Sequence, residues 1–430
     1  MVRSKRPVIA LKSGCSCSMP GVWQAVAHNE GAAVVFHSPK ACAHVSQEMS
    51  LGIYYRSITR QEFVAGRYLA PLISSELNDE HSVFGGAEQL RDCINFVARQ
   101  YQPRYIVVAG SCVAGVIGDD IAEVAAAVEQ EIAIPVIAVP CSGYLDGEYH
   151  AGFYYAAMAV AERFMTPRPA VPGQVTILGD CGGPDSQDCR EIKSMLESFG
   201  LIVHTQFPGG ACQQDIEQAA ASSLNILLGR SQSFAWIRKL ATGLQERCGI
   251  PFFDSPHPVG WLETKEWLTE LGTLLGRPEA AEQAIAAERQ RLQAAVQEVR
   301  PNLQSVKMVL VIGRPLMYFE PEWVMEWLSL AEIEPAAIIL LRGLTNTQQA
   351  ELRQVLKTHT QAPVVEQDEA DEMMAEAELI LTTHELTNDH QRQFFLPLLL
   401  PIGVGGLIRQ LRRLERLALR PALRGGILYG

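Results

Sequence analysis

Long uninterrupted apolar runs and positive charge are both scarce in this sequence. The longest apolar run, Phe394 to Ile408, is interrupted by two prolines and three glycines, so it falls short of the roughly 20 apolar residues that a membrane-spanning helix needs. Lys and Arg number 36 against 48 Asp and Glu, which gives a formal charge of −12. Because phosphate groups are bound by basic surfaces, we expect neither nucleic acid nor an anionic membrane as a partner.

The N-terminus has little that could direct the chain out of the cell. Met1 to Arg6 is basic, but the apolar run that follows, Pro7 to Leu11, is too short for the hydrophobic region of a signal peptide. We therefore expect a cytoplasmic protein. In that compartment the ten cysteines should be thiols, with a minority recruited as metal ligands.

The Cys-x-x-Cys pair of a typical structural zinc site is also missing, and the closest pair, Cys15-Ser16-Cys17, is tighter. Three cysteines instead accompany turn residues: Cys17 precedes Pro20-Gly21, Cys42 follows Ser38-Pro39, and Cys112 follows Gly110-Ser111. One such cysteine would be read as a small buried apolar residue. Three together favour thiolate ligands of an iron-sulfur cluster, which needs deprotonated sulfur on a backbone that can approach it closely.

The remaining cysteines lack a partner signature. We expect core or surface thiols at Cys93, Cys141, Cys181, Cys189, Cys212 and Cys248.

Apolar strands alternate with helical segments along the chain, which predicts an α/β fold. In the first third we expect strands at Ala33 to His37, Tyr105 to Ala109 and Ile134 to Val139. A break at Thr166 to Pro169 precedes a second run of alternation, and a third begins at Lys307. Since 430 residues are too many for one core, we expect three domains, at 1–168, 169–300 and 301–430.

Other polar signals have simpler structural interpretations. Asp119-Asp120 resembles a magnesium or acid-base pair, but we expect an N-cap and a dipole-matching acid at a helix start. Gly403-Val404-Gly405-Gly406 departs from the phosphate-binding G-x-G-x-x-G pattern, so we expect a loop before the final helix. His37 and His44 flank Cys42 and are expected to be hydrogen-bonded structural groups.

An ordered set of motifs resembles the nitrogenase component 1 family, which includes nitrogenase subunits, cofactor-assembly scaffolds and light-independent protochlorophyllide and chlorophyllide reductases. Its cluster motifs are matched by Cys17-Ser18-Met19-Pro20-Gly21, by His37-Ser38-Pro39-Lys40-Ala41-Cys42, and by Cys112 with Val116-Ile117-Gly118-Asp119-Asp120. Further matches in the same order are Phe84-Gly85-Gly86, Ile134-Pro135-Val136 with Ser142-Gly143-Tyr144, and Pro256-His257-Pro258-Val259-Gly260 with Thr264. Each motif alone is weak, whereas the ordered set is specific.

The resemblance implies three Rossmann-like domains with parallel sheets around a central cleft. It also implies that Cys17, Cys42 and Cys112 hold an iron-sulfur cluster, of the 4Fe-4S or the 8Fe P-cluster type, at a subunit interface. The expected partners are an alpha-type subunit, in a heterotetramer of two alpha-type and two beta-type chains, and a homodimeric ATP-dependent iron-sulfur reductase. We expect a beta-type subunit that relays electrons to a shared substrate site. The alternatives are a scaffold for assembly of a complex metallocofactor and a tetrapyrrole reductase subunit.

The sequence departs from the family pattern in the middle domain. Alpha-type subunits hold their catalytic cofactor on a cysteine there and on a histidine in the last domain. Here the corresponding segment, Leu228 to Ser233, has no cysteine, and His384 and His390 are the candidates for the histidine. A nitrogenase-like role is therefore expected in preference to dinitrogen reduction itself.

Overall fold

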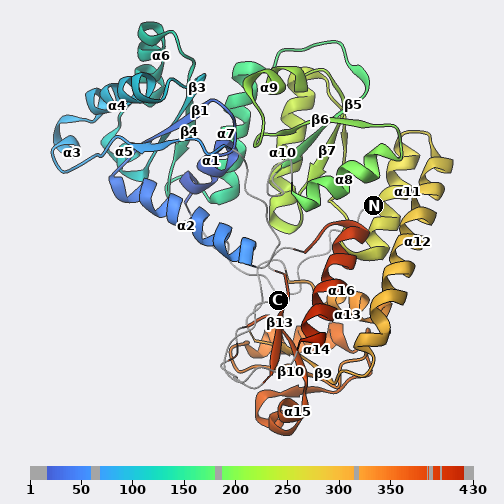
Figure 1. Cartoon of the computed structure of the whole chain (residues 1–430). Helices are drawn as coiled ribbons and strands as arrows, with labels where there is room; N and C mark the ends of the chain where they lie inside the picture. Colours follow the sequence, from blue (N-terminus) through green and yellow to red (C-terminus); the bar gives the residue numbers. More distant parts are fainter. Residues whose placement is uncertain are drawn as a thin grey trace. The chain divides into compact units, whose positions relative to one another are not determined.

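The computed structural model describes residues 17–59, 68–179, 186–313, 319–384, 386, 391–397 and 400–420 (Figure 1). The chain divides into two compact units, one that ends at His257 and one that begins at Pro258. Two parallel sheets belong to the first unit and one to the second, so the α/β class with parallel sheets is confirmed. Each of the three predicted domains contains one sheet, while the boundaries at 168 and 300 stay predictions.

The first sheet has the strand order β2-β1-β3-β4, and all its ladders are parallel. Its strands are β1 (Ala32–His37), β2 (Leu72–Ser74), β3 (Tyr105–Gly110) and β4 (Val136–Ser142). The helices of this region are α1 (Met19–Val26), α2 (Lys40–Thr59), α3 (His81–Phe84), α4 (Ala87–Tyr101), α5 (Cys112–Ile117), α6 (Ile121–Ile132) and α7 (Tyr149–Phe164). The three strands predicted here are confirmed to within a few residues.

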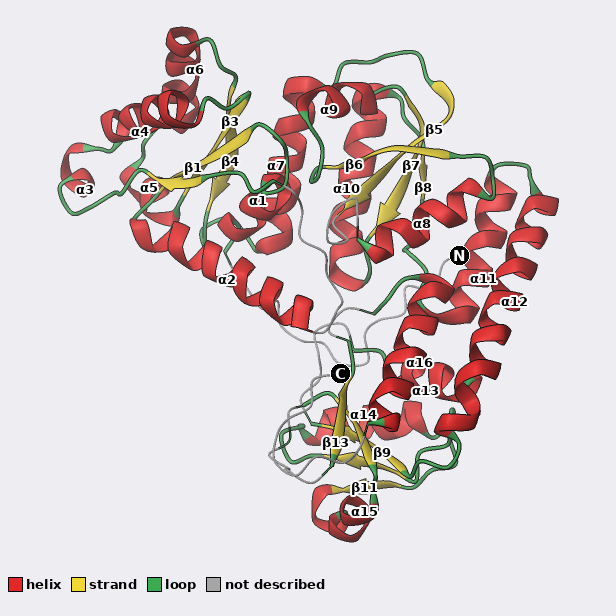
Figure 2. Ribbon diagram, viewed as in Figure 1, coloured by secondary structure: helices red, strands yellow, loops and turns green. Residues whose placement is uncertain are grey.

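Helices cover both faces of this sheet, which is why β1 and β3 are buried along their whole length (Figure 2). Val35 and Val108 pack in a core with α4 and α6. Val34 and Phe36 point to the opposite face and share a core with α1 and α7. The carboxyl ends of the strands are thereby held at one edge, where loops can present side chains.

The second sheet has the order β6-β5-β7-β8, again with parallel ladders. Its elements are β5 (Val171–Gly179), α8 (Gln187–Glu197), β6 (Ile202–Phe207), α9 (Gln213–Ala219), β7 (Ser222–Leu228), α10 (Ser231–Cys248) and β8 (Phe252–Phe253). Leu240 and Leu244 of α10 belong to the same apolar core as Ala156 and Val160 of α7. This shared core joins the two sheets of the first unit.

The second unit is built on a five-stranded parallel sheet of order β11-β10-β9-β12-β13. Its strands are β9 (Met308–Ile312), β10 (Ala337–Leu340), β11 (Val364–Glu366), β12 (Leu379–Thr382) and β13 (Arg392–Phe395). Its helices are α11 (Gly260–Leu274), α12 (Pro278–Leu303), α13 (Pro321–Leu330), α14 (Asn346–Leu356), α15 (Asp371–Glu376) and α16 (Gly403–Leu419), with a short 3-10 turn η1 (Gln367–Glu369).

The prediction of a loop at Gly403 to Gly406 is wrong, because these residues form the first turn of α16. A Cβ at position 406 would come 2.7 Å from the Cβ of Pro401, so this turn packs too closely for a larger residue. Gly406 therefore serves packing. Among the described helices, none combines the length and the apolar character needed to cross a bilayer.

Candidate functional site

Each of the three predicted cluster ligands lies at the start of a helix at the carboxyl edge of the first sheet. Cys17 directly precedes the N-cap of α1, Cys42 is the third residue of α2, and Cys112 is the first residue of α5. We expected turns at these positions, whereas Cys42 and Cys112 lie in the first turns of helices that we did not predict. All three side chains are partly exposed, and none of the eight cysteines in the described ranges forms a disulfide.

Backbone hydrogen bonds and one glycine bring the Cys17 and Cys112 segments together. The N–H and hydroxyl of Ser18 both donate to the carbonyl of Gly143, over 3.3 and 3.1 Å. Gly143 has a φ of +58°, and a Cβ there would come 2.9 Å from the backbone N of Cys112. Only glycine lets this loop approach so closely. Gly143 is thus the spacer between the two cysteine segments, a role that sequence reasoning missed although the motif containing it was noted.

The Cys42 segment is joined to the Cys112 segment through the end of β1. The N–H of Ser111 donates to the carbonyl of His37 over 3.0 Å. Ser38 follows, and its side chain interacts with the Cys42 thiol. These contacts connect the three cysteine segments to one another. They run from Cys17 through Gly143 to Cys112, and from there through His37 to Cys42.

Electrostatics connects two of the thiols directly. Burial raises the pKa of Cys42 above its usual value, and the charge of Cys112 raises it further, while the hydrogen bond with Ser38 lowers it. Two thiolates in this setting disfavour each other unless a cation lies between them. Within the described residues, no three His, Cys, Asp or Glu side chains lie close enough to hold one metal ion.

The donor set fits an iron-sulfur cluster, which spreads its ligands over several iron atoms instead of gathering them on one. The donors are thiolates, a glycine gives the backbone close access, and the partial exposure of all three cysteines leaves one side open. Burial and the charge of Cys112 raise the pKa of Cys42, and bound iron would favour the Cys42 thiolate against both effects.

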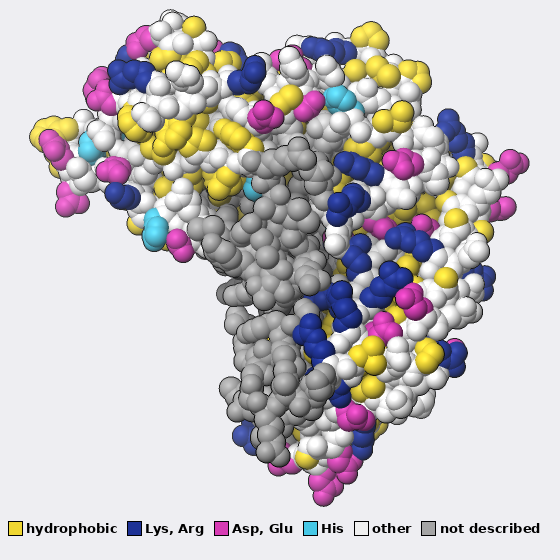
Figure 3. Space-filling model, in the orientation of Figure 1, with side chains coloured by type: hydrophobic (Ala, Val, Ile, Leu, Met, Phe, Trp, Pro, Cys, Tyr) yellow, Lys and Arg dark blue, Asp and Glu magenta, His cyan; other side chains and the backbone are white. Residues whose placement is uncertain are grey.

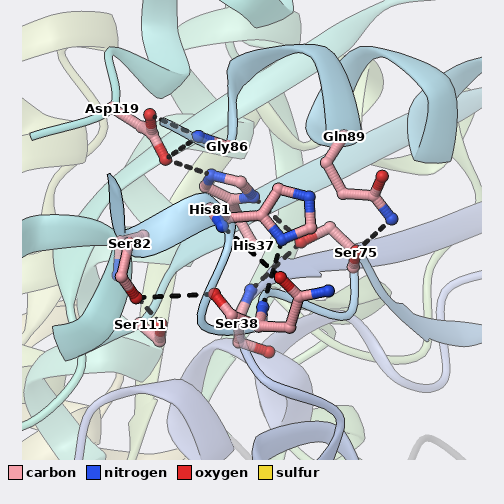
Figure 4. Close-up of polar contacts among 11 residues, drawn as sticks. His37, Ser38, Ser75, His81, Ser82, Gly86, Gln89, Ser111 and Asp119 are labelled. Carbon is pink, nitrogen blue, oxygen red and sulfur yellow. Dashed lines mark hydrogen bonds and ion pairs between the residues drawn. The ribbon is translucent and has the colours of Figure 1, made fainter. Parts of the chain in front are cut away.

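The histidine and aspartates of the motifs have well-defined partners (Figure 4). His37 is fully buried and lies 2.9 Å from Asp119, so its predicted structural role is confirmed. Asp120 accepts from the N–H of Glu123 and caps α6, as predicted. The carboxylate of Asp119 does not contact the start of α6; it contacts His37 and accepts from the N–H of Gly86, the N-cap residue of α4.

Large apolar side chains are exposed around the cysteines. Val116 of α5 is 78% exposed, and Tyr144 and Leu145, which follow β4, are 65% and 61% exposed. Figure 3 shows apolar side chains gathered over the region of α1 and α5. An exposed apolar surface beside partly exposed cysteines is typical of a protein-protein interface.

Other predicted residues lie elsewhere. Leu228 ends β7 and Ser233 lies in the first turn of α10, on the second sheet. His384 follows β12 of the second unit and is exposed. Cys15, Cys181 and His390 fall outside the described residues.

Comparison with known proteins bears on the identity of the chain. The family model described as nitrogenase component 1 type oxidoreductase matches residues 17–418. The nitrogenase molybdenum-iron protein alpha chain of Methanosarcina barkeri is 24% identical over 285 residues, covering 64% of this chain and 51% of that protein. The alpha chain of Clostridium pasteurianum is 28% identical over 249 residues, with 56% and 45% covered.

The nitrogenase iron-molybdenum cofactor biosynthesis protein NifE of Nostoc sp. is 24% identical over 304 residues, covering 69% of this chain and 60% of that protein. The chain thus spans about half to three fifths of these relatives. A solved structure described as nitrogenase Cp1 at pH 5 shares the fold, with a TM-score of 0.61 at 19% identity over 98% of this chain and 91% of that one. The chain belongs to the nitrogenase component 1 type oxidoreductase family.

Proposed function

We propose that this chain is a subunit of a nitrogenase-like reductase in which Cys17, Cys42 and Cys112 hold an iron-sulfur cluster at a subunit interface. Proteins of this family bind iron-sulfur clusters, in agreement with the predicted cofactor. The observation that carries the proposal is the continuous set of loops around Gly143 and His37, which unites three cysteines far apart in the sequence.

The role of this chain's own residues is to hold and shield the cluster. Thiolates of the three cysteines would be its ligands, and the bound group would supply one-electron transfer. The apolar side chains of Val116, Tyr144 and Leu145 would be covered by a second chain, which would exclude water from the open side of the cluster.

The partners follow from this arrangement. An alpha-type chain would cover the apolar surface, and a homodimeric ATP-dependent iron-sulfur reductase would deliver electrons. The named relatives are alpha chains and NifE proteins, so the beta-type assignment and the heterotetramer of two alpha-type and two beta-type chains stay predictions.

The proposal is tested on protein purified anaerobically with its co-purifying chain. Iron, acid-labile sulfide and low-temperature EPR are measured for the unchanged protein, for Cys42→Ala, and for Cys248→Ala as a matched control on α10. We expect iron and sulfide in the unchanged protein and in the control, and loss of both in Cys42→Ala. Full iron content in Cys42→Ala would overturn the ligand assignment.

A second candidate function is a scaffold for cofactor assembly. The similarity to NifE, whose name is that of a cofactor biosynthesis protein, favours it, and so does the lack of a cysteine from Leu228 to Ser233. A scaffold would hold the cluster but would reduce no substrate when supplied with the reductase and ATP. Turnover of a small substrate or a tetrapyrrole in that assay would exclude the scaffold role.

A further inference from the structure

The two adjacent aspartates of the Gly118-Asp119-Asp120 motif have different partners. Asp120 accepts from the N–H of Glu123 over 2.9 Å and caps α6. The side chain of Asp119 is only 6% exposed and points toward His37 and the N–H of Gly86 (Figure 4). Its carboxylate accepts from the N–H of Gly86 over 2.9 and 3.0 Å and lies 2.9 Å from Nε2 of His37.

The protons of this network can be assigned from its acceptors. A carboxylate only accepts, so Nε2 of His37 carries the proton that it donates to Asp119. Burial lowers the pKa of His37, which favours the neutral ring, and Nδ1 then accepts from the hydroxyl of Ser75 over 2.9 Å. The Ser75 oxygen accepts in turn from the N–H of Ser38 over 3.3 Å. Every polar atom of the His37 ring has one partner.

This network lies between two predicted ligand segments. The carbonyl of His37 accepts from the N–H of Ser111, which precedes Cys112. The network ends at Ser38, whose side chain contacts Cys42. The space around the ring is full, because a Cβ at Gly86 would come 2.9 Å from Cε1 of His37. A change in the His37 ring position would therefore move both cysteine segments.

We propose that Asp119 is a positioning residue that acts through His37 to fix the distance between the Cys42 and Cys112 segments. The inference rests on the proposed function, since it assumes that these cysteines hold a cluster. Asp119 itself touches neither thiol in this arrangement of contacts. It fixes the orientation of the His37 ring, and the ring orientation fixes the positions of the Cys42 and Cys112 segments.

The test compares Asp119→Ala with Asp119→Asn and with Asp120→Ala in the anaerobically purified protein with its co-purifying chain. The rate of iron release to a chelator, the EPR line shape and the melting temperature are measured for each. Removal of a group that orients metal ligands weakens metal retention about 10- to 100-fold, so we expect iron release from Asp119→Ala at least about tenfold faster, with a changed EPR line shape.

The asparagine variant separates positioning from simple loss of structure. Its amide has the shape of the carboxylate, and if the His37 proton moves to Nδ1, the amide can still accept from Gly86 and donate to Nε2. We expect Asp119→Asn to release iron at close to the unchanged rate. Asp120→Ala loses a helix cap, so its melting temperature should fall while iron release and EPR stay unchanged.

Several outcomes would overturn the inference. One is an Asp119→Ala protein with the iron release and EPR of Asp120→Ala, and another is an Asp119→Asn protein that loses iron as fast as Asp119→Ala. If Asp119→Ala does not fold, His37→Asn replaces it, because the shorter amide can keep the Ser75 contact and cannot reach Asp119; unchanged iron release in that variant would also refute the idea. Absence of iron from the unchanged protein would instead contradict the proposed function.

Discussion

Helices α1 and α7 cross at two glycines, and this crossing places Cys17. A Cβ at position 152 would lie 1.8 Å from the carbonyl oxygen of Ser18, and a Cβ at position 21 would lie 1.8 Å from that of Tyr149. Ser18 directly follows Cys17 and is bonded to Gly143. Gly152→Ala should therefore push the start of α1, with Cys17, away from the other two cysteine segments.

The magnitude follows from the geometry. Real Cβ atoms essentially never come closer than 3.0 Å to another heavy atom, so the gap must open by at least 3.0 − 1.8 = 1.2 Å. The obstacle is backbone and cannot rotate away, which puts the cost near the upper end of overpacking, about 3 kcal/mol. Alanine in a helix recovers about 1 kcal/mol relative to glycine. The net loss of about 2 kcal/mol corresponds to a melting temperature lower by about 4–8 °C.

The assay is thermal unfolding followed by circular dichroism, with iron content measured on the same anaerobic samples. Gly243→Ala in α10 is the control, because its Cβ would meet only the flexible end of Met158, at 3.0 Å. The control should melt at the unchanged temperature or above it and keep its iron. If Gly152→Ala has the same melting temperature as the control and keeps its full iron content, the close crossing of α1 and α7 does not position Cys17.

Three further predictions concern other parts of the chain. Asp146→Ala removes the acceptor of the Ser142 N–H at 2.6 Å and the second acceptor, at 3.2 Å, that the Ser18 hydroxyl has besides the Gly143 carbonyl. Urea unfolding should show a loss of about 1–3 kcal/mol, and no loss would contradict the contacts. Burial raises the pKa of Cys141 to about 12, so its thiol should resist iodoacetamide at pH 8 in the folded protein, as peptide mass spectrometry can check. In the unfolded chain a thiol ionises at about pH 8.5. The free energy of unfolding that Cys141 contributes by staying protonated in the folded state should therefore be complete below that pH, and should be lost as the pH rises through 12. Gly260→Ala forces alanine to a φ of +78° against the Glu326 carboxylate, and calorimetry should show the second unit melting at a lower temperature.

The elements of the fold were predictable where one strong pattern acted alone. The short, fully apolar run that begins at Tyr105 is typical of a strand buried on both faces of a sheet, and it forms such a strand, β3. We did not predict α2, because Ser38-Pro39 is typical of a turn and the helix begins immediately after it. The sequence also presented Gly403 to Gly406 as a loop, since glycine disfavours helix interiors, but close packing on Pro401 overrides that propensity.

The candidate ligands could be proposed from the sequence, whereas the residues that support them could not. Three cysteines beside turn residues form a noticeable pattern, so Cys42 and Cys112 were candidates before the structure was known, and their role as ligands stays a prediction. Asp119 and Asp120 have identical side chains in adjacent positions, and only the path of the chain after α5 decides which of them caps a helix. Gly143 acts through the atom that it lacks, and that effect depends on Cys112, a residue 31 positions away (143 − 112 = 31).

The position of these supports bears on the division of labour in the chain. Every contact described for the cysteine segments, including the crossing of α1 with α7, lies between Cys17 and Phe164 and belongs to the first sheet and its helices. The segment from Leu228 to Ser233, where the family's cofactor cysteine is absent, belongs to the second sheet. Loss of that cysteine therefore removes no contact from the cluster site. The contacts that hold the three cysteine segments are thus independent of the segment from Leu228 to Ser233, and both proposed functions of this protein are compatible with that separation.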